Sequence, residues 1–177
     1  EIASCLVGSE MCIRDRFNEL PLAHIILHPR LGKQQYKGEV DLEGFEAFYK
    51  ECTHPLFYNG DLHTANDIRS ITTRFPRLAG IVIGRGLLAN PALALEYKQG
   101  TPISSDEMAK KVGQLHTEVF NAYQELLQGG EAQLLMKMKS FWEYLLPDGD
   151  RKARKTIHKT SKLANYQSAV SNLLGTY

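Results

Sequence analysis

The stretches YNGDLHTANDI (residues 58–68) and GIVIGRGLLANP (residues 80–91) share one pattern, and this pattern decides the fold. In each, a short apolar run stops at a turn that contains glycine, and a sequence typical of a helix follows. The run AHIILH (23–28) stops in the same way at HPRLGKQQYKG. Short apolar runs bounded by Pro and Gly predict buried strands at 23–28, 55–58 and 80–83.

Helices are predicted between and after these strands. Asp41 is suited to cap a helix over 41–52, and Thr64 to cap one that runs through Arg74. A third helix is predicted to begin near Pro91, where the missing N–H costs little. The order βαβαβα predicts a parallel α/β sheet with right-handed crossovers. Three strands cannot close a barrel, so we expect either a small open sheet or part of a larger one.

An all-helical region is predicted to follow a boundary near 100–102. Ser104 or Ser105 is suited to cap the first helix, which ends before the glycines at 129–130. Its apolar face is predicted to comprise Met108, Val112, Leu115, Val119, Tyr123 and Leu126. Further helices are expected over 132–146 and within 151–174. The expected domains are therefore 17–100 for the α/β part and 101–177 for the helical part.

The first sixteen residues do not fit this plan. LVGSEMCIRDR (6–16) lacks the apolar core of a signal peptide. A back-translation of it resembles a transposase-type sequencing adapter read in frame. We therefore expect residues 1–16 to be a non-native arm joined to a truncated gene, so that Cys5 and Cys12 carry no function. The alternative is a genuine irregular N-terminal arm.

Composition indicates a folded globular protein, with 43% hydrophobic and 23% charged residues and a net charge of +1. No apolar run reaches the ~18–20 residues of a membrane span, so no membrane partner is expected. The three cysteines lack metal-type spacing, which predicts no metal site. Their number is odd and suggests no disulfide framework, which predicts a reducing cytoplasm. Charge is uneven, because the segment 151–162 contains six Lys or Arg and no acidic residue.

Candidate site residues follow the predicted strands. His28, Asn59 and Gly84 each come at a strand end, where parallel α/β folds bind ligands. Gly60 would let the backbone approach a ligand and adopt a conformation closed to other residues. Arg85 is suited to bind a phosphate.

Backbone N–H groups of the GRG segment (84–86), and the positive end of the helix that follows, would also favour an anion. Together these features predict a phosphate ligand. His54 and His63 are expected to be surface residues.

The three segments, in this order and spacing over residues 17–98, resemble the second half of the tRNA-dihydrouridine synthases. The helical remainder, including KMKSFWEYLL, is similar in character to the C-terminal domain of that family. The resemblance implies the last three βα units of a truncated TIM (β/α)8 barrel that binds FMN, followed by a helical tRNA-binding domain. It also implies reduction of the flavin by NADPH and hydride transfer to the C5=C6 bond of a tRNA uridine.

The resemblance also implies roles for individual residues. His28 matches a histidine near the flavin, and Arg30 a basic residue that faces the active-site mouth. Asn59, Gly60 and Asp61 match the loop that holds the ribityl-phosphate of FMN, and Gly84 and Arg85 match the phosphate clamp. The family's acid cysteine and its flavin-contacting lysine belong to earlier strands, and Cys52 lies at the wrong end of the sheet to replace the cysteine. We therefore expect this chain neither to reduce uridine nor to hold FMN tightly.

The basic helical region fits an RNA partner. The candidate phosphate contacts there are Lys137, Lys139, Arg151, Lys152, Arg154 and Lys155. Trp142 is expected to pack between helices. Two alternatives stay open: another FMN- or sugar-phosphate-binding TIM-barrel enzyme that acts on a small metabolite, and a non-catalytic RNA-binding helical module.

Overall fold

The computed structural model describes residues 10–34, 37–146 and 150–176. The chain forms two compact units, Glu1–Gly86 and Leu87–Tyr177, which we call the sheet unit and the helical unit. The division lies upstream of the predicted boundary near 100–102, because Ala92 already belongs to the core of the helical unit. Cys5 and the rest of residues 1–9 of the predicted arm lie outside the described residues.

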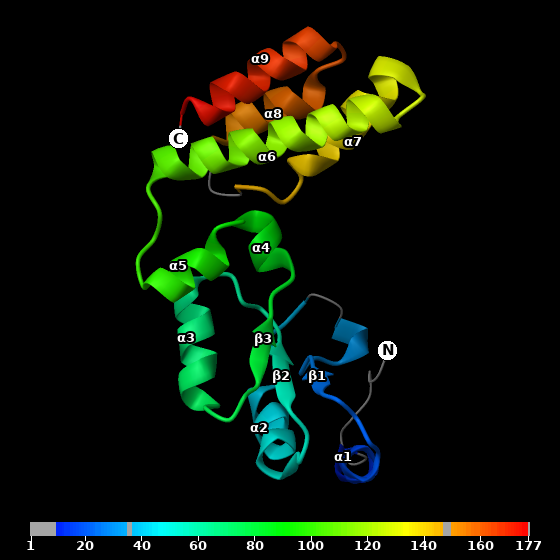
Figure 1. Ribbon diagram of the computed structural model, residues 1–177, viewed down its shortest axis with the longest axis vertical. Helices are drawn as coiled ribbons and strands as arrows, with labels where there is room; N and C mark the ends of the chain where they lie inside the picture. Colours follow the sequence, from blue (N-terminus) through cyan, green and yellow to red (C-terminus); the bar gives the residue numbers. More distant parts are fainter. Residues whose placement is uncertain (1–9, 35–36, 147–149, 177) are drawn as a thin grey trace. The chain divides into compact units, whose positions relative to one another are not determined.

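The sheet unit contains the three predicted strands, β1 (Ile25–Leu27), β2 (Leu56–Asn59) and β3 (Gly80–Val82) (Figure 1). They are parallel and lie in the order β1-β2-β3. A short 3₁₀ helix, η1 (Gly32–Gln34), follows β1. These three strands confirm the parallel α/β sheet, and the TIM-barrel interpretation, which goes beyond them, stays a prediction.

Two helices connect the strands, and both begin at their predicted caps. At α2 (Leu42–Glu51), Asp41 Oδ1 accepts a hydrogen bond from the Gly44 backbone N–H (2.9 Å). At α3 (Ala65–Arg74), Thr64 and Asp67 form a reciprocal capping box. Each bond satisfies a backbone donor that the first turn of a helix leaves unpaired.

An aromatic cluster forms the core of the sheet unit. Phe45 of α2 makes edge-to-face contacts with Tyr58 of β2 and with Phe75, each with ring centroids 4.9 Å apart. All three side chains are 1% exposed. In parallel strands alternate residues face opposite sides, and Ile26 on the other side is 49% exposed. The core therefore lies on the helix-covered side of the sheet.

Helix α1 (Glu10–Glu19) includes part of the segment predicted to be a non-native arm. Arg14, which is 6% exposed, pairs with Glu51 at the end of α2 (2.8 Å). Asn18 donates to the Glu51 carbonyl (3.0 Å) and accepts from the Thr53 N–H (3.1 Å). Residues 10–16 are thus helical and lie next to α2, and their interpretation as an adapter translation stays a prediction.

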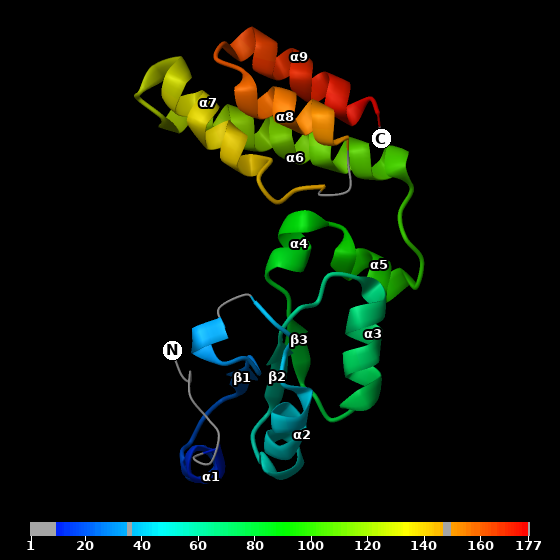
Figure 2. The same cartoon turned by 180° about the vertical axis from the view of Figure 1, so that it is seen from behind.

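Among the described residues after β3, the helices are α4 (Arg85–Ala89), α5 (Leu93–Gln99), α6 (Ser105–Leu126), α7 (Gly130–Phe141), α8 (Arg151–Lys159) and α9 (Leu163–Leu174). Helix α4 begins at the end of the sheet unit. Ser104 caps α6 through the Glu107 N–H (3.2 Å), as predicted. Helices α6 to α9 lie side by side in both views (Figures 1 and 2).

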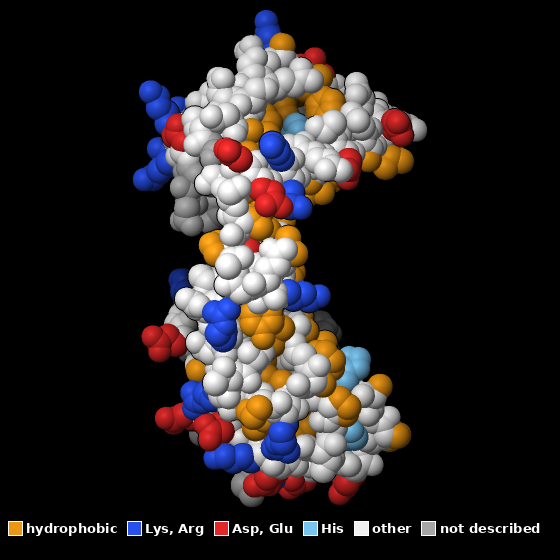
Figure 3. Space-filling view, turned by 60° about the vertical axis from the view of Figure 1, so that its left-hand side comes forward, with side chains coloured by type: hydrophobic (Ala, Val, Ile, Leu, Met, Phe, Trp, Pro, Cys, Tyr) orange, Lys and Arg blue, Asp and Glu red, His pale blue; other side chains and the backbone are white. Residues whose placement is uncertain are grey.

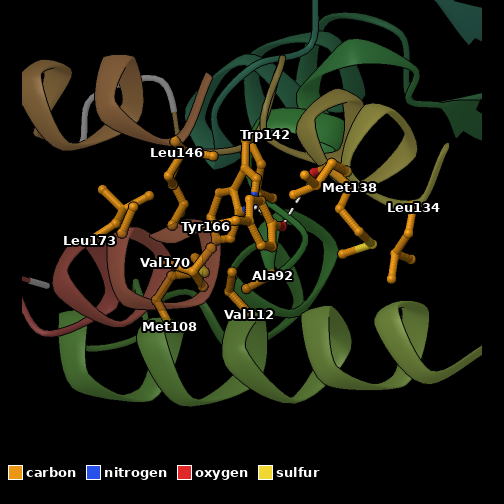
Figure 4. Close-up of a cluster of buried hydrophobic side chains, with 14 residues drawn as sticks. Ala92, Met108, Val112, Leu134, Met138, Trp142, Leu146, Tyr166, Val170 and Leu173 are labelled. Carbon is orange, nitrogen blue, oxygen red and sulfur yellow. Dashed lines mark hydrogen bonds between the residues drawn. The ribbon is translucent and has the colours of Figure 1, made fainter. Parts of the chain in front are cut away.

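The core of the helical unit surrounds Trp142 and Tyr166, both of which are 0% exposed (Figure 4). Trp142 therefore packs between helices, as predicted. The predicted face of α6 is wrong in part, because Leu115 is 39% and Leu126 is 75% exposed, whereas His116 is buried. His116 Nε2 lies 2.7 Å from the Tyr166 hydroxyl, so a polar contact turns His116 into the core.

Candidate functional site

The carboxyl ends of the three parallel strands border one hollow of about 200 Å³. Parallel pairing carries all three ends to the same edge of the sheet. The hollow is lined by the last residues of β2 and β3 and by residues that follow the three strands: His28, Asn59, Asp61, Leu62, His63, Val82, Gly84, Arg85 and Gly86. Five of the six predicted cofactor-binding residues thus lie around a single space, and their role in binding stays a prediction.

Asp61 joins two arginines at this hollow. Its Oδ1 accepts from Arg85 Nη2 (3.0 Å), and its Oδ2 pairs with Arg30 Nη2. The Arg30 side chain is 2% exposed, and Nη2 also donates to the Gly38 carbonyl (2.9 Å). We call this arrangement the Asp61 bridge. Two positive groups and one negative group leave one net positive charge beside the hollow, which favours an anion.

The backbone at residues 60–61 differs from the prediction. Asp61, not Gly60, adopts the left-handed conformation, with φ 41°. Gly60 is required for space instead, because a Cβ there would meet Tyr58 Oη at 3.0 Å and Val40 Cγ1 at 3.1 Å. Asp is among the residues that tolerate positive φ, since its short polar side chain can bond locally. Two features of the loop after β2 therefore position the Asp61 carboxylate: the close packing at Gly60 and the positive φ of Asp61.

His28 directly follows β1 and is exposed. Partial desolvation, and then the charge of Arg30, lower its pKa, whereas Asp61 raises it and Arg85 lowers it. A histidine with a lowered pKa is neutral at pH 7 and offers one N–H donor and one nitrogen acceptor. Burial, and then Asp61, raise the pKa of the neighbouring Tyr58 to about 12, so its hydroxyl also stays neutral. The net charge of the site therefore comes from the Asp61 bridge.

Gly84 leaves the loop after β3 open. It is exposed, and among the described residues a Cβ built on it would meet no heavy atom within 4 Å beyond Gly84 and its two chain neighbours. Because helix α4, which follows, has only five residues, we do not assign its N-terminal end a role in anion binding. Of the groups predicted to attract an anion after β3, the structure places the side chain of Arg85, which is 38% exposed, at the hollow.

The size of the hollow bears on which group it fits. Sites that enclose a whole small ligand measure about 300–1,000 Å³, whereas this hollow measures about 200 Å³. The Asn59 amide and the Arg85 guanidinium at its wall are typical donors to phosphate oxygens. The residues present therefore fit the phosphate end of a cofactor such as FMN, rather than the entire flavin.

Sequence reasoning missed one residue here. His63 was expected only at the surface, yet it is an exposed residue that also lines the hollow. Its position four residues after Asn59, in the same loop after β2, was the signal that could have identified it. His54 has a different environment, because its Nε2 lies 2.8 Å from the Phe17 carbonyl.

The residues predicted to contact tRNA divide into two groups. Lys137, Arg151, Lys152 and Lys155 are exposed. Lys and Arg side chains project from the helical unit in the space-filling view (Figure 3). Lys139, in contrast, donates to the Thr160 carbonyl at the end of α8.

The other members of the second group also bind backbone carbonyls. Arg154 donates to the carbonyls of Trp142 (3.0 Å) and Glu143 (3.1 Å) after α7. Arg30 is buried in the Asp61 bridge, and its expected place at the active-site mouth stays a prediction. Such contacts satisfy carbonyls that helix ends and turns leave unpaired. Lys139, Arg154 and Arg30 therefore have partners within the fold, and their predicted contact with tRNA stays a prediction.

Metal ligands, membrane spans and free thiols are the other features that bear on function in the part of the chain that the structure describes. There, no group of three or more His, Cys, Asp or Glu side chains could hold a metal ion. Within the same residues, no helix is both long and apolar enough to span a bilayer. Cys52, a free cysteine, lies at the C-terminal end of α2, in the connection that leads into β2. It is therefore at the opposite end of the strand from Asn59.

Comparison with known proteins identifies the family. A search of curated proteins finds no match to the chain. A model of the family described as dihydrouridine synthase (Dus) matches residues 17–173, which is nearly the whole chain. The match begins at the residue where the predicted native sequence starts, and it includes both the strand-end hollow and the helical unit. The chain therefore belongs to the dihydrouridine synthase family.

Proposed function

We propose that this chain carries the flavin-phosphate site and the tRNA-binding helices of an enzyme that reduces the C5=C6 bond of tRNA uridine. Family membership supports an oxidoreductase function of the dihydrouridine synthase type, in tRNA processing. The observation that carries the finer proposal is the hollow where His28, Asn59, Asp61 and Arg85 meet at the ends of three parallel strands. FMN is the proposed cofactor, and NADPH is the proposed reductant.

The side chains at the hollow would bind and orient the cofactor. Arg85 and the Asn59 amide would hold the phosphate, and the exposed backbone of Gly84 would let the phosphate approach the loop. His28 is kept neutral by its surroundings, so it would give a hydrogen bond without adding charge. When bound, the flavin supplies hydride transfer, which no amino-acid side chain can perform.

Exposed cations of the helical unit would bind the tRNA backbone. Arg151, Lys152, Lys155 and Lys159 are exposed on α8, and the sequence has no acidic residue from 151 to 177. Neutralising phosphates with such residues releases counterions and makes binding dependent on salt. Structured RNA is recognised mainly by shape and by phosphate contacts, so this surface requires no base-reading residue.

We infer that the chain does not reduce uridine by itself. The resemblance implies that the acid cysteine and the flavin-contacting lysine belong to strands that precede the three described here. Cys52 is at the opposite end of β2 from the hollow and cannot donate a proton there. The chain would therefore bind the phosphate part of FMN weakly and show no turnover.

Flavin binding tests this proposal. Quenching of flavin fluorescence should show that the chain binds FMN more tightly than riboflavin, which lacks the phosphate. Arg85→Ala should abolish the difference, whereas Arg69→Ala, a change to an exposed arginine of α3, should leave it intact. Equal affinity of the unaltered chain for both flavins would overturn the proposed phosphate site.

A second measurement separates the alternatives. The chain should bind tRNA with an affinity that falls as salt rises, and Arg151, Lys152 and Lys155 should carry much of that dependence. Salt-dependent tRNA binding without any preference for FMN would favour the non-catalytic RNA-binding module. A preference for FMN without tRNA binding would favour a metabolite-specific flavin barrel.

A further inference from the structure

We infer that Asp61 is a positioning residue, which holds Arg85 in place at the hollow by tying it to the buried Arg30. This inference rests on the proposed function, because the anion that Arg85 would receive is the phosphate of FMN. It assigns Asp61 a role that acts through Arg85, in place of direct contact with the ligand. It also gives Arg30 a role in the same bridge, because Arg30 holds Asp61 and Asp61 holds Arg85.

The contacts form a chain from the interior to the surface. Arg30, with a side chain 2% exposed, is fixed by the Gly38 carbonyl at 2.9 Å. Asp61, 30% exposed, uses one carboxylate oxygen for Arg30 and the other for Arg85, which is 38% exposed. The bridge thereby links the segment after β1, the loop after β2 and the start of α4 after β3. A group anchored in this way loses less conformational freedom when a ligand binds.

A simple Coulomb argument makes the opposite prediction for Asp61. A carboxylate beside an anion site repels the anion, so Asp61 would weaken phosphate binding if it acted only through its charge. Two points favour the view that Asp61 anchors Arg85. Both carboxylate oxygens are engaged by arginines, which leaves the site with one net positive charge. A guanidinium also carries five N–H donors, so pairing through Nη2 does not prevent Arg85 from binding a second anion.

The backbone conformation at residue 61 permits a substitution that removes the charge of Asp61 and keeps its geometry. Asp61 has φ 41°, a conformation that Asn adopts at least as readily as Asp. Asp61→Asn therefore removes the charge while it keeps the shape and the backbone geometry. Asp41→Asn is the matched control: Asp41 caps α2 in the same unit, and Asn caps helices as well as Asp does.

The experiment measures FMN and riboflavin affinity, by flavin fluorescence, for the whole chain and four variants. These are Asp61→Asn, Arg85→Lys, the double variant with both changes, and Asp41→Asn. We expect Asp61→Asn to lose about tenfold in FMN affinity, the range of one charge-assisted contact, and to keep its riboflavin affinity. Asp41→Asn should keep both affinities. The double variant should bind FMN no more weakly than Arg85→Lys alone, because Asp61 acts through Arg85.

Three results would overturn the inference. Asp61→Asn could bind FMN as tightly as the unaltered chain or more tightly, which would make Asp61 a bystander or a competitor of the phosphate. A folded Asp61→Asn chain could lose FMN and riboflavin affinity equally, which would show that Asp61 does not act on the phosphate contact of Arg85. Additive effects in the double variant would separate Asp61 from Arg85. If Asp61→Asn does not fold, Arg30→Lys tests the same bridge, and it should lower FMN affinity and spare riboflavin affinity.

Failure of the proposed function is recognised separately, because the unaltered chain would then bind both flavins equally. In that case, ¹⁵N relaxation of the Arg85 Nε–H group in the ligand-free chain decides the inference. An anchored Arg85 should become more mobile in Asp61→Asn and stay ordered in Asp41→Asn. Unchanged order in Asp61→Asn would show that Asp61 does not position Arg85.

Discussion

The sheet unit and the helical unit use polar groups in opposite ways. In the sheet unit, the charged groups Arg30, Asp61 and Arg85 meet at the rim of the strands, beside a hollow of about 200 Å³. In the helical unit, the neutral groups of Trp142 and Tyr166 meet inside the core. Each arrangement satisfies hydrogen bonds, but only the first leaves charge beside open space.

The difference follows from how each unit is built. Parallel strands bring several loops to one edge, where short polar segments can converge without being covered. Packed helices bury whole faces, so a polar group there must find its partner inside. His116, Trp142 and Tyr166 do so, with Trp142 Nε1 donating to the Tyr166 hydroxyl at 2.9 Å. We therefore expect ligand chemistry in the sheet unit and fold stability from the polar core of the helical unit.

The largest expected effect comes from a substitution in the core of the helical unit. Trp142→Ala removes a side chain that is 0% exposed, together with the Nε1–H group that donates to the Tyr166 hydroxyl. It should destabilise the helical unit by about 3–5 kcal/mol, measured by circular dichroism in denaturant. Met136→Ala, in helix α7, which ends at the residue before Trp142, changes a side chain that is 59% exposed and should cost far less. Similar losses for the two variants would mean that this core does not hold the unit together.

A smaller effect tests the packing behind the hollow. Gly60→Ala places a Cβ 3.0 Å from Tyr58 Oη and 3.1 Å from Val40 Cγ1, and it should destabilise the sheet unit by about 1–3 kcal/mol. Gly84→Ala has open space around the added carbon and should change stability by less than about 0.5 kcal/mol. Denaturant unfolding of both variants checks this contrast. A stable Gly60→Ala chain would contradict the close packing at residue 60.

The buried polar core should make the helical unit sensitive to acid. Burial lowers the pKa of His116, so the unfolded state, with a pKa near 6.5, binds a proton that the folded state resists. Stability from this group is therefore present above pH ~6.5 and is lost as pH falls below it, by at most about 1.4 kcal/mol per pH unit. The fluorescence of Trp142, the only tryptophan, can follow unfolding from pH 8 to pH 5.

His116→Gln is the control for this measurement. It keeps a polar side chain beside Tyr166 and removes the titrating group, so the dependence of stability on pH below ~6.5 should become flatter. Equal slopes for the two chains would assign the acid sensitivity to other residues.

The smallest expected effects separate cations that hold helix ends from cations that face solvent. Arg154→Gln removes donors to the Trp142 and Glu143 carbonyls and should cost about 1 kcal/mol of stability. Lys155→Gln, on the exposed side of the same helix, should leave stability unchanged. If the helical unit binds tRNA as proposed, Lys155→Gln should lower the salt dependence of binding by about one ion.

Unfolding curves and tRNA titrations of the two variants check this distinction. A reversed result, with Lys155→Gln destabilising the unit and Arg154→Gln weakening tRNA binding at full stability, would exchange the roles of the two residues.

Much of the local structure was predictable because its causes are local. Asp41, Thr64 and Ser104 cap their helices as expected, since each cap depends on a side chain and a backbone N–H three residues away. The strand positions were also predicted, because apolar runs that end at turns have few other stable conformations. The approximate membership of the hollow followed from the rule that parallel strands share their carboxyl edge.

The remaining features depend on contacts between distant residues. The sequence pattern of α6 favoured Leu115 over His116, yet the hydroxyl of Tyr166, fifty residues away, draws His116 inward. Charge predicted tRNA contacts for Lys139 and Arg154, and the family resemblance predicted that Arg30 faces the active-site mouth. Their partners are backbone carbonyls or a carboxylate brought near by folding, and no local pattern reveals them.

The sequence by itself determined the order of strands and helices, the helix caps, and the family resemblance of the strand-end segments. Only the tertiary structure decided that Asp61 carries the left-handed backbone, that it bridges Arg30 and Arg85, and that Trp142 donates to Tyr166. The physical reason is the range of the interactions. Turns, caps and periodicity act over a few residues, whereas ion pairs and buried hydrogen bonds form between groups that meet only once the chain has folded.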